Sequence, residues 1–410
     1  MSPHALRNIR LLSVFNLCSD FRIYAPIAVV FFAHVTGSYA LAVLLFSIAK
    51  IASTVLEVPT GVISDRIGRK LTILAGQAAS IFSIGCYAVA GDFSLLAVGA
   101  AFEGLAFSCF SGNNEALLYD TLKDEGAPDQ YAEYQGRVSA MFQIALAASA
   151  ALAALILVWF GMRVLFLLSL VPQLCGFVIA LFFREPAQHD LRFETNVFAH
   201  MSEAMAGFMR NARLRDVSIA SILGFALGEA KHMFYPAFFA LLWPSWALGV
   251  AGMLTHGFAT LGFRAAGRLI ARFGEFSVLV WSSAASTLFG LGAVTLPNVT
   301  SPAISSLASL SFGPGVIAQG SLMQKGFTDA QRATMASLIA LGGNLLFALA
   351  AYALGALADR IGPRYALLIG EILAISVTLL YWRLHRSVAA ESGSETHEDQ
   401  TAQRRSARHT

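Results

Sequence analysis

Charged residues are scarce in this chain, and their scarcity decides its class. Asp, Glu, Lys and Arg make up only 13% of the 410 residues, whereas hydrophobic residues make up 56%. Soluble domains carry about 25% charged residues, so this composition disfavours a soluble protein. Apolar runs of about 20 residues recur along the sequence, and each is long enough to cross a bilayer as a helix. Such continuous runs do not fit the alternating strands of a membrane barrel, so we predict an all-α membrane protein.

The sequence also lacks the motifs that several kinds of functional site need. The sequence has no G-x-S-x-G, no H-E-x-x-H and no phosphate-binding P-loop, which disfavours an enzyme and an ATP-driven pump. Its net charge of +3 is too small to indicate binding to nucleic acid. The cysteines lie inside apolar runs without metal-ligand spacing, and we predict no metal and no other cofactor. They are Cys18, Cys86, Cys109 and Cys175.

The apolar runs predict twelve membrane spans. The basic start, Met1 to Arg10, precedes a run that has Asp20 and Arg22 and no small-residue cleavage site, so we interpret that run as an uncleaved first span. The predicted spans are 11–33, 39–61, 70–90, 94–121, 136–159, 163–183, 216–242, 246–271, 276–297, 301–325, 332–358 and 363–385. The predicted units are 1–183, a six-helix bundle; 184–215, a cytoplasmic linker with an amphipathic helix over Val197–Phe208; 216–386, a second six-helix bundle; and 387–410, a polar, disordered tail.

The distribution of Lys and Arg gives an independent prediction of orientation. If both termini are cytoplasmic, 22 of the 28 basic residues fall on the cytoplasmic side, and only Arg163, Arg360 and Arg364 fall in periplasmic loops. This is the bias that the positive-inside rule describes. It favours a multi-pass protein of the cytoplasmic (inner) membrane of a bacterium.

The loop after the second predicted span carries the most specific motif. Its residues, Gly61-Val62-Ile63-Ser64-Asp65-Arg66-Ile67-Gly68-Arg69-Lys70, resemble the signature loop G-x-L-x-D-R-x-G-R-[KR] of the major facilitator superfamily, with Ile63 in place of the leucine. The resemblance implies two pseudo-symmetric six-helix bundles that work as a single chain. It also implies that the loop latches the two bundles together on the cytoplasmic side and acts in gating. These roles carry over to Gly61, Asp65, Arg66, Gly68, Arg69 and Lys70. The alternative is a charged loop that only sets topology.

An internal repeat supports two halves. Gly267-Arg268-Leu269-Ile270-Ala271-Arg272-Phe273-Gly274 overlays residues 61–68 without a gap, although Ala271 replaces the aspartate. Parallel six-helix repeats are typical of this kind of transporter.

Asp20 is the first candidate for chemistry within a span. Ser13, Asn16, Asp20 and Tyr24 form a polar stripe at helical spacing, and Arg22 lies about 200° around the helix from Asp20. A charge at mid-bilayer costs roughly 2.5–3.5 kcal/mol, so Asp20 and Arg22 are each candidates for a functional role. Burial favours the neutral carboxyl, which would let Asp20 exchange protons. The alternative is a static buried salt bridge.

The fourth and seventh spans supply the remaining candidates. Glu115 lies among small and polar residues that fit either a water-filled cavity or close helix packing. Glu229, Lys231 and His232 cluster near the middle of the seventh span. Glu229 and His232 are one turn apart and could interact, and the alternative for Lys231 is a structural ion pair. In the resembled family, the first, fourth, seventh and tenth spans line the central pathway.

The leading hypothesis is a secondary active transporter that exports a small organic molecule by alternating access, coupled to protons. One departure weakens export: the Gly-Pro run that proton-driven drug exporters carry in the fifth span is absent from residues 143–155. Proton-symport uptake of an anionic metabolite, with Arg22 and Lys231 as anion contacts, is the alternative. A membrane receptor or lipid enzyme that transports nothing is a more distant one.

Overall fold

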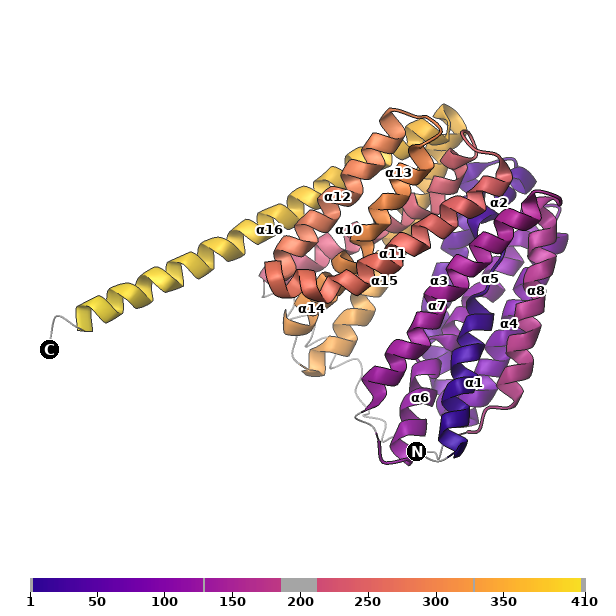
Figure 1. Cartoon of the computed structure of the whole chain (residues 1–410), viewed down its shortest axis with the longest axis horizontal. Helices are drawn as coiled ribbons and strands as arrows, with labels where there is room; N and C mark the ends of the chain where they lie inside the picture. Colours follow the sequence, from indigo (N-terminus) through magenta and orange to yellow (C-terminus); the bar gives the residue numbers. More distant parts are fainter. Residues whose placement is uncertain (1–2, 128–129, 186–211, 327–328, 407–410) are drawn as a thin grey trace.

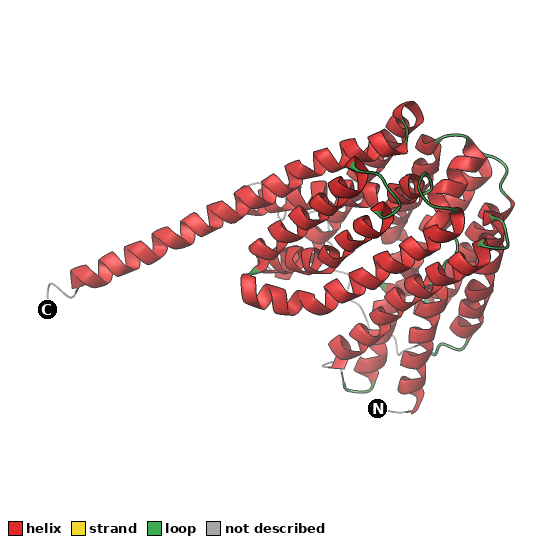
Figure 2. Cartoon of the chain, turned by 45° about the horizontal axis from the view of Figure 1, so that its top comes forward, coloured by secondary structure: helices red, strands yellow, loops and turns green. Residues whose placement is uncertain are grey.

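The chain folds into a helical bundle throughout the part that the structure describes. This computed structural model describes residues 3–127, 130–185, 212–326 and 329–406, and every regular element in those ranges is a helix (Figure 2). The first half contains α1 (Pro3–Asp20), η1 (Ala25–Ile27), α2 (Ala28–Thr36), α3 (Tyr39–Ile67), α4 (Arg69–Val89), α5 (Phe93–Phe110), α6 (Asn113–Asp124), α7 (Tyr131–Leu157) and α8 (Met162–Leu181). The second contains α10 (Ala212–Phe239), α11 (Ser245–Phe273), α12 (Glu275–Thr295), α13 (Ser301–Leu307), η3 (Ala308–Ser311), α14 (Phe312–Gly326), α15 (Asp329–Ile361) and α16 (Pro363–Ser406).

Helix boundaries follow local signals in the sequence. Ser38 caps α3 by accepting a hydrogen bond from Leu41 N, and Asp92 caps α5 by accepting one from Leu95 N. Such side chains satisfy backbone donors that the first turn of a helix leaves free. These caps confirm the predicted starts of the second and fourth spans.

Eight helical segments among the described residues are long and apolar enough to cross a membrane. They cover the predicted first, second, third, fourth, sixth, ninth, eleventh and twelfth spans. The other four predicted spans are also helical, as α7, α10, α11 and α13–α14. Their lower apolar content has visible sources: α10 contains Glu229 and Lys231, and α11 contains three arginines in its second half.

Three spans that we predicted as continuous are broken. The first is divided into α1, η1 and α2; the fourth into α5 and α6; and the tenth into α13, η3 and α14. Pro26 lies at the start of η1, and Gly112, with a φ of 72°, separates α5 from α6. The left-handed φ of Gly112 interrupts the helical ladder there, whereas α1 already ends at Asp20, before Pro26, which lies inside η1.

The break in the first span is closed by side chains from α8. Nε2 of Gln173 donates to the carbonyls of Cys18 and Ser19, at 3.3 and 3.0 Å, and the hydroxyl of Ser169 accepts from Ile23 N at 3.0 Å. Nε2 of Gln77 in turn donates to Oε1 of Gln173 at 2.8 Å. Backbone groups inside a bilayer require partners, and this network supplies them.

The helices form two bundles that pack against each other through a few pairs. Helices α1–α8, coloured indigo to magenta, make one bundle, and helices α10–α16, coloured pink-red to yellow, make the other (Figure 1). The main contacts between them join α3 to α15 and α7 to α11. One buried hydrophobic cluster continues across both bundles, and two smaller clusters lie within one bundle each.

The terminal segment differs from the prediction of disorder after residue 386. Helix α16 continues to Ser406 and projects away from the bundles (Figure 1). Adding residues to an existing helix avoids the cost of nucleation, so a polar segment can continue a helix that is anchored by packing. The amphipathic helix predicted over residues 197–208 lies outside the described residues.

Candidate functional site

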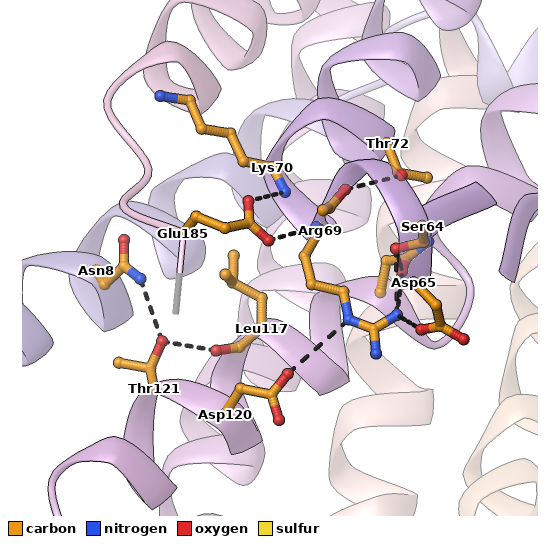
Figure 3. Close-up of polar contacts among 12 residues, drawn as sticks. Asn8, Ser64, Asp65, Arg69, Lys70, Thr72, Leu117, Asp120, Thr121 and Glu185 are labelled. Carbon is orange, nitrogen blue, oxygen red and sulfur yellow. Dashed lines mark hydrogen bonds and ion pairs between the residues drawn. The ribbon is translucent and has the colours of Figure 1, made fainter. Parts of the chain in front are cut away.

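The signature loop is held by ion pairs and hydrogen bonds within its own bundle. Nη1 of Arg69 lies 2.8 Å from Oδ1 of Asp65, and Nε of Arg69 lies 3.9 Å from Oδ2 of Asp120 (Figure 3). Nη1 of Arg69 also donates to Oγ of Ser64 at 3.1 Å and to Oδ1 of Asn113 at 3.3 Å. Arg69 therefore connects the end of α3 with α6.

Glu185, directly after the sixth span, binds the other side of this loop. Its carboxylate accepts hydrogen bonds from Arg69 N at 2.5 Å and Lys70 N at 2.8 Å, at the start of α4 (Figure 3). A carboxylate is favoured there because the N-terminus of a helix is its positive end. Gly68 has a φ of 98°, and a Cβ added to it would lie 2.8 Å from the Glu185 carboxylate. Sequence reasoning missed Glu185, because a single Glu after a span indicates no partner.

The six predicted loop residues differ in their contacts. Asp65 and Arg69 contribute side chains, Lys70 contributes its backbone N–H, and Gly68 provides the turn. Gly61 has open space where a Cβ would lie, and the side chain of Arg66 is exposed. The structure thus brings four of the six into one network.

Asp20 is the last residue of α1 and is half-buried. Its carboxylate makes no hydrogen bond or ion pair within the described residues. A carboxylate at the C-terminus of a helix lies at the negative end of the dipole, so this position favours the neutral acid or a nearby cation. One turn earlier, Oδ1 of Asn16 accepts a hydrogen bond from Nδ2 of Asn114 in α6 at 3.1 Å.

Arg22 and Tyr24 join a largely buried cluster around Glu103. Nη1 of Arg22 lies 2.5 Å from Oε1 of Glu103, and its guanidinium stacks over the ring of Phe107 at 4.6 Å. The hydroxyls of Tyr87 and Tyr24 donate to the same carboxylate at 2.8 and 3.5 Å. The predicted stripe through Tyr24 is wrong, because the chain leaves the helix after Asp20 and helical spacing no longer applies.

Lys231 forms a corresponding buried cluster in the second bundle. Its Nζ lies 2.8 Å from Oε2 of Glu371, whose Oε1 accepts a hydrogen bond from the Tyr235 hydroxyl at 2.7 Å. Lys231 is 6% exposed and Glu371 is 1% exposed. Gly290 makes room for this carboxylate, since a Cβ there would lie 2.5 Å from it. The geometry is that of a buried ion pair, as the alternative stated above for Lys231 requires.

The other predicted residues have separate neighbours. Glu229 lies 4.0 Å from Nζ of Lys50 in the other bundle. His232 interacts electrostatically with His256 of α11. Glu115 is exposed in the first turn of α6, where the helix dipole favours a carboxylate. The structure therefore assigns Glu229 and His232 different partners instead of pairing them.

Described contacts between the bundles concentrate toward one end. At the start of α3, Asp359 of α15 accepts hydrogen bonds from the Ser38 hydroxyl and Tyr39 N, both at 2.6 Å. A Cβ on Gly249 of α11 would lie 2.5 Å from the carbonyl oxygen of Ala150 in α7. Near mid-span, Nδ2 of Asn344 donates to Oγ1 of Thr54 at 2.9 Å. The following residues 55–67 of α3 include large exposed hydrophobic side chains, namely Val55, Val58, Val62, Ile63 and Ile67.

Comparison with known proteins identifies the family. The family profile described as Major Facilitator Superfamily matches residues 11–351. The chain belongs to this superfamily. No curated protein matches the chain at the sequence level.

Solved structures show the same fold for this superfamily member. The nucleoside transporter NupG, in a point-mutant form, is 14% identical with a TM-score of 0.78, and the match covers 93% of this chain and 99% of that one. A second NupG structure gives a TM-score of 0.75, at 14% identity and 94% and 99% coverage. A bacterial homolog of the human lysosomal transporter Spinster gives 0.71, at 14% identity and 94% and 98% coverage. At these identities the likeness shows the fold alone, and the chain is a transporter by family and architecture.

The partners in this superfamily transporter were harder to predict than its charges. Glu103, Glu371 and Asp120 stand out in the sequence as acids in or near apolar runs, but nothing local assigns them to Arg22, Lys231 and Arg69. Asp359 has a signal in the sequence, because the residues around it resemble the signature loop itself.

Proposed function

We propose that this protein is a secondary active transporter that moves a small organic molecule across the bacterial cytoplasmic membrane by alternating access, in exchange for protons. The family match and the twelve-span fold support transport. Asp20 carries the proton-coupling part of the proposal. Its carboxylate makes no hydrogen bond or ion pair in the described part of the chain, and it lies at a helix end that disfavours its charge.

The broken first span, to which Asp20 belongs, takes part in a contact between the bundles. Pro26, six residues later in the same broken span, meets Gly252, where a Cβ would lie 3.4 Å from Cγ of Pro26. His256 follows Gly252 by one helical turn and interacts with His232. Proton uptake at Asp20 would change the charge of the span that makes this contact. A change in protonation that alters the packing of two bundles is the kind of coupling that alternating access requires.

We further propose that both termini are cytoplasmic, as the basic residues predict. The end at which Asp359 meets Ser38 would then face the periplasm. The structure would be the conformation closed to the periplasm, in which substrate enters between the bundles from the cytoplasm. The Spinster homolog, described as inward-facing and unoccupied, supports this assignment through its similar architecture. Lipid and protons are the other partners, and we propose a single-chain unit.

Export of a neutral or cationic compound fits the charges better than uptake of an anion. Anion uptake would use Arg22 and Lys231, but each already pairs with a carboxylate. Releasing Lys231 would leave the buried charge of Glu371 uncompensated, which typically costs about 3–5 kcal/mol. The carboxylate of Asp20 makes no ion pair with any described residue, so it can attract a cationic compound or hold a proton. Uptake remains the second candidate because direction follows from gradients as well as from residues.

The test compares resistance to toxic compounds in a bacterium without its major efflux pumps. Cells expressing the wild type, Asp20→Asn and Asp92→Asn are grown against a broad panel. Asp92→Asn is the matched control, because asparagine caps a helix as well as aspartate does and Asp92 only caps α5. Protection that is lost in Asp20→Asn alone, at equal membrane abundance, supports the proposal. Protection unchanged in Asp20→Asn removes this carboxylate from the mechanism, and increased sensitivity favours uptake.

Proton movement across the membrane is then measured directly, with the compounds that gave protection. Wild-type protein in sealed vesicles with a pH-sensitive dye inside should move protons when the compound is added, and Asp20→Asn should not. Compound movement without proton movement would contradict coupling. Binding without any movement would favour a receptor.

A further inference from the structure

The signature loop has a second copy at the end of α15. Gly355-Ala356-Leu357-Ala358-Asp359-Arg360-Ile361-Gly362-Pro363-Arg364 aligns without a gap to residues 61–70. Both copies contain glycine, aspartate, arginine, isoleucine and glycine at the same positions, and both end on a basic residue. The last glycine of each has a left-handed φ, 98° at Gly68 and 85° at Gly362, and joins two consecutive helices. Unlike the decayed copy at residues 267–274, this one keeps its aspartate.

The two copies lie at opposite ends of one helix pair. Ala40 of α3 packs against Gly355 of α15, and Thr54 bonds to Asn344, so numbers rise along one helix as they fall along the other. Helices α3 and α15 are therefore antiparallel and belong to different bundles. The copy at residues 61–70 ends α3 at one end of the pair, and the copy at residues 355–364 ends α15 at the other.

The second copy is engaged with the opposite bundle. Asp359 accepts hydrogen bonds from the Ser38 hydroxyl at 2.6 Å, Tyr39 N at 2.6 Å and Ala40 N at 3.1 Å. Two of these donors are backbone groups of the first turn of α3, where the helix dipole attracts a negative charge. In the first copy, Asp65 instead pairs with Arg69 of its own loop.

Gly355 sets the distance at which this contact forms. A Cβ at this position would lie 2.6 Å from Ala40 Cα and 2.8 Å from both Ala40 N and the Tyr39 carbonyl oxygen. These are backbone atoms, which cannot turn aside as a long side chain can. Any side chain at position 355 would therefore push α15 away from α3 and lengthen the hydrogen bonds of Asp359, one turn further along.

We propose that Gly355 and Asp359 form a clasp with residues 38–40 that stabilises the conformation closed at this end, and that transport requires its release in each cycle. The clasp rests on the alternating access of the proposed function. Its hydrogen bonds to Ser38 and Tyr39 are solvent-exposed, so water can replace the lost partners when the bundles separate. Asp359 is thus a positioning residue for the conformational step and does not contact substrate.

The clasp can be tested through the distance between the bundles, without knowing a substrate. Spin labels are placed at Trp159→Cys and Leu296→Cys, which are 81% and 74% exposed and follow α7 and α12. The full chain first has its native cysteines replaced. Double electron–electron resonance then measures the distances between the two labels and gives the ratio of short to long distances. The variants compared with wild type are Asp359→Asn, Asp359→Ala and Gly355→Val, with Asp92→Asn and Gly292→Ala as controls. Gly292 has open space at its Cβ position.

Loss of a charge-assisted contact of this kind shifts an equilibrium by roughly tenfold. We expect the share of long distances to rise about tenfold in Asp359→Ala and Gly355→Val, less in Asp359→Asn, and not in either control. Unchanged distances in both Asp359→Ala and Gly355→Val would overturn the proposal. An equal shift in the controls would do so too. Because Asp359→Asn keeps the shape of the side chain, it serves if the other variants fold poorly. If the label distances lengthen in these variants but the wild-type protein moves no compound, the clasp proposal is retained and the transport proposal is rejected.

Discussion

The turn at Gly68 gives the sharpest test of the structure itself. Alanine at this position would need a φ near 98° and a ψ near 157°, a region that is essentially restricted to glycine and costs about 1–3 kcal/mol for other residues. Its Cβ would also displace the Glu185 carboxylate, 2.8 Å away. That carboxylate caps α4 through Arg69 N and Lys70 N, and losing a cap typically costs about 0.5–2 kcal/mol. We therefore expect Gly68→Ala to lower the free energy of unfolding by about 1.5–5 kcal/mol.

Denaturant titration in detergent micelles measures this change against a matched control. Gly61→Ala alters the same loop at a helical position with nothing within 4 Å of the added Cβ, so its stability should stay within about 1 kcal/mol of wild type. In a Glu185→Ala background the cap is already lost, and Gly68→Ala should cost only the backbone strain. Additive effects of the two substitutions would refute the reasoning, because residues that share a contact must show coupling. Equal effects of Gly68→Ala and Gly61→Ala would refute it as well.

Two further predictions concern packing inside each bundle. Lys231→Met should destabilise the protein by about 3–5 kcal/mol by leaving Glu371 charged and unpaired, and adding Glu371→Gln should restore most of that loss in the same titration. Gly104→Ala should lower stability by about 1–3 kcal/mol, because its Cβ would lie 2.5 Å from the Ala49 carbonyl oxygen, whereas Gly85→Ala meets nothing within 4 Å. Equal thermal stability of the two alanine variants in detergent would contradict this packing.

The fold could be predicted from the sequence because its signals are local. Apolar runs, caps such as Ser38 and the charged loop before α4 each act within a few residues, and the structure confirms the spans that they predict. The break after Asp20 could not be predicted in this way. Proline is compatible with the first turn of a helix, and the groups that stabilise the break come from Ser169 and Gln173, on a helix far along the chain.

The charges of the candidate site were visible, but their pairing was not. A buried cation requires a carboxylate, yet the spans offer several acids for Arg22 and Lys231. Only the packing of distant helices selects Glu103 and Glu371, which lie 81 and 140 residues away. Helical spacing failed for Tyr24 for a related reason: it assumes a helix that the tertiary contacts interrupt. Asp359 is the opposite case, since its motif could have been found by comparing the chain with itself.

The polar network around Gln173 limits how this protein can change during evolution. Gln173 donates to two carbonyls at the end of α1 while it accepts from Gln77 and Ser80 of α4. Leucine would leave both carbonyls without this donor, and glutamate would supply acceptors only. Substitution at position 173 should thus be tolerated only together with changes at positions 77 and 80 or with a continuous first helix. Among related sequences, these three positions should vary as a group, and should do so even where the transported compound differs.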